Sequence, residues 1–279
     1  MGQNTKALKA RIRTVDSTMH ITKAMELVAS SKIRRARERM ESGRFYRAVL
    51  RDAFADLAAS DTPYSRPRDK SLPTLHIVIA GDRGLAGGYN NNVFKLTNRA
   101  LRPGDRVIPI GRRAAEYFAR RAAVDEADRH HSSEHLTTAA CADIARRVKE
   151  AYDRGEIGRV RLVSTAFASM LTQTAEETIL LPLAPAEAEK KAAGPRADVL
   201  YEPDAASVLA AIIPEYLAGV VYSAACESFA AEVAARRAAM DTASKNAASM
   251  IDQLNLQYNR ARQSAITQEI TEIVAGGAT

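Results

Sequence analysis

The segment with the clearest chemical potential is a glycine-rich run, Gly81-Asp82-Arg83-Gly84-Leu85-Ala86-Gly87-Gly88, which follows a short apolar stretch. A glycine-rich turn between a strand and a helix N-terminus can bind phosphate through its backbone N–H groups. Its spacing fits neither G-x-G-x-x-G nor G-x-x-x-x-G-K-[ST], and the first lysine after the glycines is Lys95. We therefore expect a tight turn here, with no bound nucleotide and no cofactor.

A second candidate is a metal site made of one glutamate and three histidines: His130, His131, Glu134 and His135. Residues four apart share one face of a helix, which is the spacing that metal ligands use. The cluster lies in a polar stretch without further ligands at matching spacing, so we expect a solvated loop. No Ser/His/Asp or Cys/His arrangement stands out either, and the sequence offers no catalytic residues.

The two cysteines, Cys141 and Cys226, follow no motif spacing. They predict structural thiols in a reducing compartment. The chain has no 18-residue apolar run and no apolar signal-peptide core, so we expect no segment that spans a membrane.

Charge is concentrated at the N-terminus of the chain. Residues 1–60 carry thirteen lysines and arginines against six acidic residues, whereas the other 219 residues balance at 27 against 27. The basic side chains are densest at Lys32, Arg34, Arg35, Arg37, Arg39, Arg44, Arg47 and Arg51. A solvated helix face is the simplest interpretation of such a run. Its density favours an acidic partner, which could be a protein, a nucleic acid or a membrane surface.

These basic residues lie on a long predicted helix over 1–60. Steps of four and three from Leu8 to Leu57 give fifteen positions, of which eleven are apolar. These positions form a seam, the line of side chains that would face a partner helix. Thr22 and Glu26 interrupt this seam, and we expect Ile21, Met25 and Val28 to replace them.

The C-terminal part of the chain predicts a partner helix over 205–275. Val220 to Ala275 holds 56 residues without glycine or proline, which as one helix would be about 84 Å long at about 1.5 Å per residue. Steps of three and four give a narrow, alanine-rich seam: Met240, Ala243, Ala247, Met250, Leu254, Tyr258, Ala261 and Ala265. The two seams predict a slim antiparallel coiled coil, with Met19–Ile33 facing residues 224–248. A helix folded back into an alanine-rich bundle is the alternative.

The middle of the chain, about 72–203, predicts a separate α/β domain with a small, mostly parallel, Rossmann-like sheet. Strands are expected at 75–80, 107–110, 159–168 and 178–183, the last two as a hairpin. Helices are expected at 92–101, 112–123 and 136–154, and a loose loop at 184–196.

Several segments, in order from one end of the chain to the other, resemble the γ subunit of F-type ATP synthases. They are the N-terminal helix segment 21–36 (ITKAMELVASSKIRRA), the loop 81–90 (GDRGLAGGYN), the segment 200–204 (LYEPD), and the C-terminal segments 258–263 (YNRARQ) and 266–274 (ITQEITEIV). Ala86 replaces the cysteine often found in the loop, and the ending holds an extra glycine. The lack of a chloroplast-type redox insert and of a transit peptide points to a bacterial protein.

The resemblance implies a non-catalytic central rotor shaft. It would couple ion-driven rotation of the membrane c-ring to conformational changes at catalytic sites in the β subunits. The implied partners are the α and β subunits, the ε subunit and the c-ring, on the cytoplasmic face of the cell membrane, with no transmembrane segment and no nucleic acid.

The resemblance also implies partner-binding residues. Arg262, Gln263 and Thr267 match positions that contact β-subunit loops, and Met25 and Arg236 match a facing pair along the coil. Lys32, Arg34, Arg35 and Arg37 would meet an acidic β-subunit loop. Tyr201 and Glu202 match the segment near the c-ring.

Two other classes of function remain as alternatives. A basic helical protein that binds nucleic acid, or acts as a scaffold, would need aromatic side chains between its arginines, and only Phe45 and Tyr46 are available. An enzyme would have to use the glycine-rich loop to bind a nucleotide.

Overall fold

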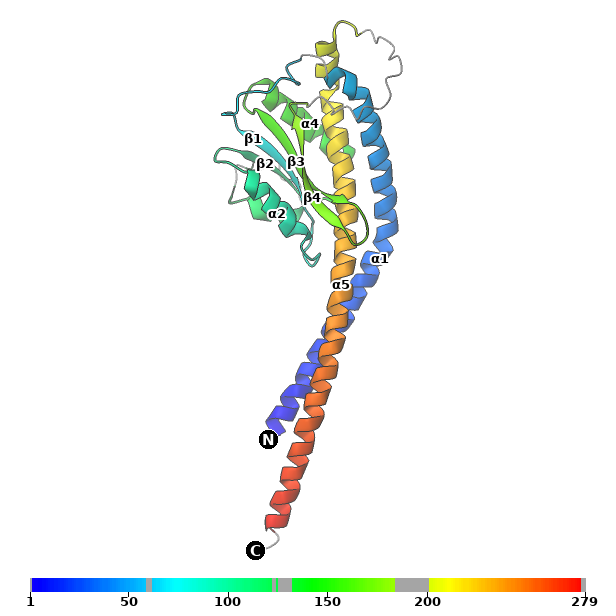
Figure 1. Cartoon of the computed structure of the whole chain (residues 1–279), viewed down its shortest axis with the longest axis vertical. Coiled ribbons are helices and arrows are strands. Elements are labelled where there is room, and N and C mark those ends of the chain that lie inside the picture. The colour runs from blue at the N-terminus through cyan, green and yellow to red at the C-terminus, as the bar shows by residue number, and fades with distance from the viewer. Residues whose placement is uncertain (1, 59–61, 122–123, 125–131, 184–200, 277–279) are drawn as a thin grey trace. The chain divides into compact units, whose positions relative to one another are not determined.

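The computed structural model describes residues 2–58, 62–121, 124, 132–183 and 201–276. In chain order the elements are α1 (Gly2–Ala58), β1 (Thr74–Ile79), α2 (Tyr89–Ala100), β2 (Arg106–Ile110), α3 (Arg112–Phe118), α4 (Thr138–Asp153), β3 (Arg159–Phe167), β4 (Gln173–Leu181) and α5 (Ala205–Gly276). They form two compact units (Figure 1). One unit joins α1 up to Ser31 with α5 from Arg236 onward, and the other comprises residues 32–235.

The first unit is an antiparallel coiled coil of α1 and α5, which confirms the predicted pairing of the terminal helices. Its seam is narrow and filled by small or flexible side chains. On α5, Met240, Ala247 and Leu254 are buried, and on α1 Ala29 is buried. The helices also share a polar contact, in which Thr22 Oγ1 lies 2.8 Å from Ser244 Oγ.

The expectation that Ile21, Met25 and Val28 replace Thr22 and Glu26 in the α1 seam was wrong for Ile21 and Val28, which are 61% and 58% exposed. Met25 is half-buried, but Thr22 and Glu26 are half-buried too and are not displaced. The polar side chains have local partners that make burial tolerable: Thr22 bonds to Ser244, and Glu26 accepts a 2.8 Å hydrogen bond from Lys23. The helix therefore keeps its register and leaves apolar side chains exposed.

The α5 seam also differs from the prediction at one position. Met250 is 44% exposed, while its neighbour Ile251 is half-buried. An α-helix has about 3.6 residues per turn, whereas alternating steps of three and four average about 3.5. A fixed series of such steps therefore drifts away from the line of side chains that contacts the other helix.

In the second unit α1 and α5 approach closely at their small residues. A Cβ on Gly43 would lie 3.3 Å from Ser223 Cα, and one on Gly219 would lie 2.4 Å from Leu50 Cδ1. Further along, the rings of Phe54 and Tyr216 are 4.7 Å apart. As residue numbers rise along α1 they fall along α5, so the helices are antiparallel here as well.

The sheet has the strand order β2-β1-β3-β4. β1 pairs in parallel with both β2 and β3, and β4 pairs antiparallel with β3 as a hairpin. This is the small, mostly parallel sheet that the sequence predicts. β4 begins at Gln173, five residues before the predicted strand, because an edge strand with a solvent-facing side can hold polar residues such as Glu176.

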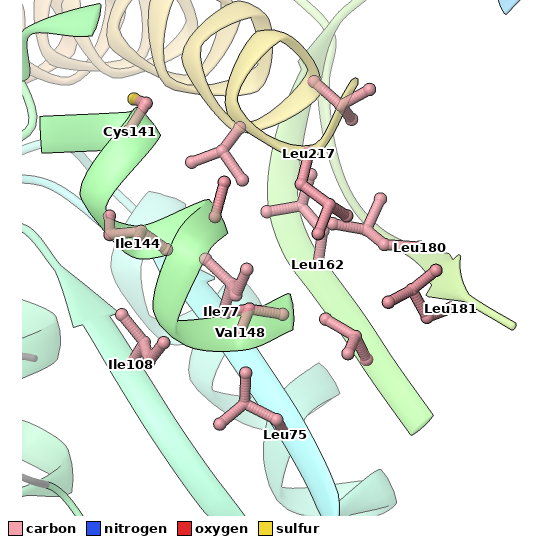
Figure 2. Packing of buried hydrophobic residues seen from close by; sticks show 14 of the residues in the cluster. Leu75, Ile77, Ile108, Cys141, Ile144, Val148, Leu162, Leu180, Leu181 and Leu217 are labelled. Carbon is pink, nitrogen blue, oxygen red and sulfur yellow. The ribbon is translucent and has the colours of Figure 1, made fainter. Parts of the chain in front are cut away.

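Helices cover both faces of the sheet. On one face, α4 and α5 pack on the strands through the largest core cluster (Figure 2): Leu75, Ile77, Ile108, Ile144, Val148, Leu162 and Leu217 belong to it. On the other face, α2 and α3 pack through Val93, Phe94 and Phe118 against Val78 and Val163. α3 ends at Phe118, short of the predicted 123, and turns follow it.

α5 extends from Ala205 through Pro214 and Gly219. By length and composition it is apolar enough to cross a membrane, contrary to the expectation that no such segment exists. The apolar stretch that meets this criterion lies within Ala206–Gln268, and half of it is buried inside the structure. The apolar side chains of this helix pack into the protein core: Leu209, Ile213 and Leu217 belong to the largest core cluster.

The predicted boundaries at 1–60, 72–203 and 205–275 stay predictions. The predicted loop at 184–196 lies outside the described residues.

Candidate functional site

The glycine-rich loop is a turn in which several polar groups have partners within the chain. Gly81 N donates a 2.9 Å hydrogen bond to Asn90 Oδ1, and Asn90 Nδ2 donates to Arg83 O. Leu85 and Gly87 have positive φ values of 61° and 57°. A Cβ on Gly81 would lie 2.7–3.0 Å from the carboxyl group of Glu232, which is buried. A buried carboxyl group against the start of the loop disfavours a bound phosphate.

Asp82 of this loop holds the segment that precedes α4. It accepts hydrogen bonds from Ser132 Oγ at 2.8 Å, Ser133 N at 2.7 Å and Glu134 N at 3.3 Å. Glu134 in turn accepts a 2.6 Å hydrogen bond from Lys32 Nζ on α1. These contacts attach α1 to the α/β domain at a point where the sequence suggested only a solvated loop.

A second attachment lies at Glu227 of α5, whose side chain is 5% exposed. Its Oε1 accepts from Arg44 Nη2 at 2.6 Å and from the backbone N of Phe167 at 3.1 Å. Its Oε2 lies 3.4 Å from Arg47 Nη2, and Arg44 Nη2 also donates to Phe167 O. Two arginines of α1, one glutamate of α5 and the end of β3 therefore meet at one carboxylate.

Ser228, next to Glu227, adds a further attachment to β3. Its Oγ accepts a 3.0 Å hydrogen bond from Thr165 N. β1 pairs with β3 only as far as Val163, so the backbone of β3 beyond that point lacks a strand on this side. Buried N–H groups need acceptors, and α5 supplies them through Ser228 and Glu227.

The predicted partner-binding residues in the coiled-coil unit lie on its surface or at its edge. Arg262, Gln263 and Thr267 are exposed, and Met25 and Arg236 are half-buried. Thr267 O accepts from Thr271 Oγ1 within α5. The three exposed side chains leave their polar groups facing solvent.

The predicted partner-binding residues in the second unit differ in their exposure and in whether they already form ion pairs. Lys32 is paired with Glu134, Arg34 lies 3.5 Å from Glu38, and Arg35 is exposed. Tyr201 is half-buried against the core beneath α5, and Glu202 is exposed. Part of the N-terminal positive charge is thus neutralised within the chain.

No group of metal-binding side chains occurs among the described residues. His130 and His131 lie outside them, and Glu134 is already paired with Lys32. Both cysteines are buried and free. Burial raises the pKa of the Cys141 thiol to about 12 and also raises that of Cys226, so neither thiol is poised as a nucleophile.

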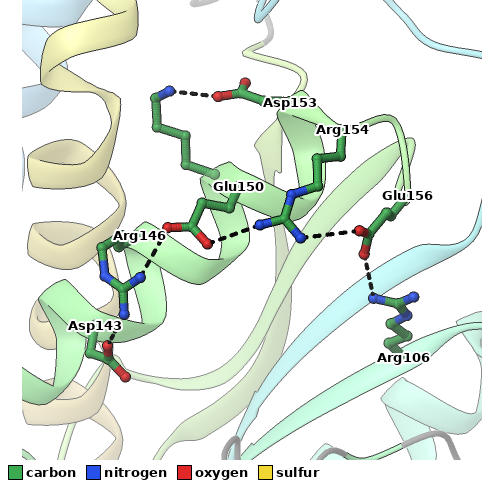
Figure 3. A network of polar contacts seen from close by, with 8 residues as sticks. Arg106, Asp143, Arg146, Glu150, Asp153, Arg154 and Glu156 are labelled. Carbon is green, nitrogen blue, oxygen red and sulfur yellow. Dashed lines mark hydrogen bonds and ion pairs between the residues drawn. The ribbon is translucent and has the colours of Figure 1, made fainter.

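The exposed face of α4 carries a network of ion pairs (Figure 3). Arg146 bridges Asp143 at 2.6 Å and Glu150 at 2.9 Å, and Arg106 of β2 reaches Glu156 at 3.1 Å. These exposed pairs are mutually satisfied, and they explain the charge pattern of α4 as a solvated surface.

Sequence reasoning missed Glu227, Ser228 and Glu232. The signal was present, because two glutamates interrupt an alanine-rich stretch of α5 that is otherwise apolar. A charge on the buried face of a helix is expected to have a specific partner. Which partner it has could not be read from sequence, because Arg44 lies 183 residues away.

Solved structures place this fold in a class. It is similar to a chain of the Euglena gracilis mitochondrial ATP synthase, OSCP/F1/c-ring, in rotational state 3, with TM-score 0.70 and 18% identity over 100% of this chain and 95% of that one. A chain of the Tetrahymena thermophila mitochondrial ATP synthase central stalk and c-ring gives a TM-score of 0.60 at 21% identity, covering 80% of this chain and 99% of that one. The fold is therefore that of a coiled-coil chain of ATP synthases.

Sequence comparison then gives the family. A family model described as ATP synthase matches residues 4–279. The ATP synthase gamma chain of Xanthomonas campestris is 40% identical over 98% of both chains, and that of Desulforamulus reducens is 38% identical over 97% of both. The chain belongs to the ATP synthase gamma chain family.

Proposed function

We propose that this chain is the central rotor shaft of an F-type ATP synthase. It couples ion-driven rotation of the c-ring to conformational change at catalytic sites that lie in the β subunits, in ATP synthesis or in hydrolysis-driven ion pumping. The observation that carries the proposal is the gamma-chain similarity over nearly the whole chain, at 40% identity. The chain itself is a non-catalytic subunit of the complex.

The architecture supports this function physically. A shaft that turns inside a sleeve must be slim and stiff, and the alanine-rich coil of α1 and α5 has a narrow seam. It must not bind permanently at one angle, which favours exposed polar contacts over a large apolar interface. Arg262, Gln263 and Thr267 are exposed and suit such contacts.

The partners follow from the same proposal. The helices predicted over 1–60 and 205–275 form the shaft within the ring of α and β subunits. The domain predicted over 72–203, with Tyr201 and Glu202, rests on the c-ring beside the ε subunit. The complex is attached to the cell membrane and this chain lies at its cytoplasmic face, as a peripheral subunit.

Lys32, Arg34 and Arg35 remain proposed contacts to acidic groups of the β subunits. Because Lys32 is 2.6 Å from Glu134, it would have to exchange that partner for a new one. Arg35 is exposed and needs no such exchange. Met25 and Arg236 are proposed as a further contact along the coil.

The internal pairing of the basic helix argues against the nucleic-acid alternative. Arg44 and Arg47, from the densest part of the basic run, share Glu227, and Lys32 pairs with Glu134. Nucleic-acid binding depends on cations that are free to neutralise phosphates.

The proposal is tested by assembly and coupling. The chain is expressed with the α, β and ε subunits of the same organism and rejoined to membranes that hold the c-ring. We expect a stable complex that hydrolyses ATP and pumps ions, while the isolated chain shows neither ATPase activity nor saturable ATP binding. The matched control is Gly84→Ala in the glycine-rich loop, which should assemble and pump like the parent. A chain that stays outside the complex, or ATP binding by the isolated chain that Gly84→Ala abolishes, would contradict the proposal.

A further inference from the structure

We propose that Glu227 is the positioning residue that makes α1, α5 and the β3–β4 hairpin one torque-bearing body. The inference rests on the proposed function of a rotor shaft, and it names the residue through which the α/β domain of that shaft is fixed to its own helices.

Glu227 is suited to this role because it touches three elements at once. It projects from α5, accepts from Arg44 at 2.6 Å, lies 3.4 Å from Arg47 on α1, and accepts from Phe167 N at the end of β3 at 3.1 Å. Arg44 also donates a hydrogen bond directly to Phe167 O. The α1 helix and the hairpin are therefore joined to each other as well as to α5.

Many of the other contacts between these elements are apolar, beside polar ones such as that of Ser228 with Thr165. Ala36 and Met40 of α1 pack on Ala230, Ala231 and Ala234 of α5, and Phe167 belongs to the same apolar cluster. Apolar contact depends on buried area and has no preferred direction, so it holds the elements together without itself fixing the angle between them. Hydrogen bonds weaken steeply when their angles change, so they resist rotation of one element against another.

The carboxylate of Glu227 lies where β3 extends beyond its pairing with β1. β3 continues past Val163 without β1 beside it, and its next two inward N–H groups, Thr165 and Phe167, bond to Ser228 and Glu227. On the hairpin these bonds are donated by backbone N–H groups, so its side of the attachment does not depend on a side-chain rotamer. A torque applied to the domain is transmitted to α5 and, through the arginines, to α1.

The electrostatics make the carboxylate hard to replace. Removing the charge of Glu227 would leave Arg44 and Arg47 as two neighbouring cations without their shared anion. The arginine side chains are 41% and 35% exposed, so water can solvate them, and the main loss is the directional bonding to the buried carboxylate. Glu227→Gln keeps the shape of the side chain and one acceptor oxygen, so it weakens the attachment without opening a cavity.

The test measures torsional stiffness in the assembled complex. The α and β subunits are fixed to a surface, and a bead is attached through Arg112→Cys on α3, a site whose side chain is 62% exposed. The native thiols of Cys141 and Cys226 are buried and should not compete for the label. With the catalytic sites inhibited, the angular variance of the bead reports how rigidly the domain is joined to the shaft.

We expect Glu227→Gln to raise the angular variance roughly twofold, because directional contacts to two elements are weakened together. Glu156→Gln is the matched control, since it removes the same charge from an exposed pair with Arg106 in the same domain. It should leave the variance unchanged. Amide exchange of Phe167 in the complex should become faster by roughly tenfold in Glu227→Gln, the factor expected when a charged hydrogen bond becomes a neutral one, and stay the same in Glu156→Gln.

If Glu227→Gln does not assemble, Arg44→Lys provides the second variant. It keeps the positive charge but has a shorter side chain and an ammonium group in place of the guanidinium whose Nη2 donates to both Glu227 Oε1 and Phe167 O. The same rise in variance is expected. Parental variance and parental Phe167 exchange in either assembled variant would overturn the inference. Failure of the parent chain to form a rotating complex would instead contradict the proposed function.

Discussion

His76 lies fully buried on β1, where Nε2 is 3.3 Å from Asp105 Oδ2. Asp105 also accepts from Thr74 N and Arg102 N at 2.8 Å each, so it ties β1 to the turn before β2. Desolvation lowers the pKa of His76 below its ordinary value, and the contact with Asp105 offsets only part of this effect. The imidazole is therefore neutral in the folded protein near neutral pH.

This depressed pKa predicts acid sensitivity. An unfolded histidine has a pKa of about 6.5, so on acidification the unfolded chain binds a proton before the folded chain does. The free energy of unfolding should fall as the pH drops below about 6.5, until the folded-state pKa is reached. His76→Gln should flatten this fall in thermal unfolding between pH 5 and 7. His135→Gln, at an exposed position, should not, and equal slopes in the parent and His76→Gln would contradict the assignment.

Among the elements, the coiled coil of α1 and α5 contains a polar layer at Thr22. Thr22 Oγ1 donates to Met19 O at 3.0 Å, which uses its one proton. Ser244 Oγ, 2.8 Å away, must then be the donor in the contact between the helices. The contact is made in this register of the two helices, since a shift of one helix would separate the two hydroxyls.

The direction of this hydrogen bond predicts unequal effects of its two partners. Thr22→Val leaves the buried Ser244 hydroxyl without its acceptor and should lower the unfolding free energy by about 1 kcal/mol. Ser244→Ala leaves Thr22 bonded to Met19 and should have a smaller effect. The measurement is thermal unfolding of the full chain followed by helical circular dichroism. A larger loss in Ser244→Ala than in Thr22→Val would show that the donor is assigned wrongly.

For the whole molecule, the proposed rotor contacts are polar and sparse. Arg262, Gln263 and Thr267 follow each other within about one helix turn, so one loop of a partner could reach all three. A charged hydrogen bond contributes roughly 1.5–3 kcal/mol, which favours one rotor angle without fixing the rotor there. Met25 occupies a half-buried position on α1, where a longer charged side chain could reach out to a partner.

These features predict two variants with opposite effects on the rotor. Met25→Lys should assemble normally but add a cation that seeks an acidic β-subunit partner, which makes one angle too stable and lowers the ratio of ion pumping to ATP hydrolysis. Arg262→Ala should assemble and weaken the contact at one angle. Both are measured as ATP-driven pumping and hydrolysis in membranes. If both variants couple like the parent, these residues are not rotor contacts.

The sequence alone was sufficient for the elements and for their order. Long stretches without glycine or proline and seams of three- and four-residue steps predicted α1 and α5, and alternating strand and helix patterns predicted the sheet. These signals are local, because propensity and periodicity depend on residues a few positions apart. The family resemblance was also readable, since its segments are contiguous in the chain.

Only the tertiary structure decided which polar groups meet. Thr22 stays in the seam because Ser244 lies opposite, Lys32 pairs with Glu134 across 102 residues, and Glu227 gathers Arg44, Arg47 and the end of β3. A buried charge in a sequence indicates that a partner must exist, but the fold selects that partner from many candidates. The physical reason is that desolvation acts on each residue where it stands, while pairing depends on chain segments brought together by packing.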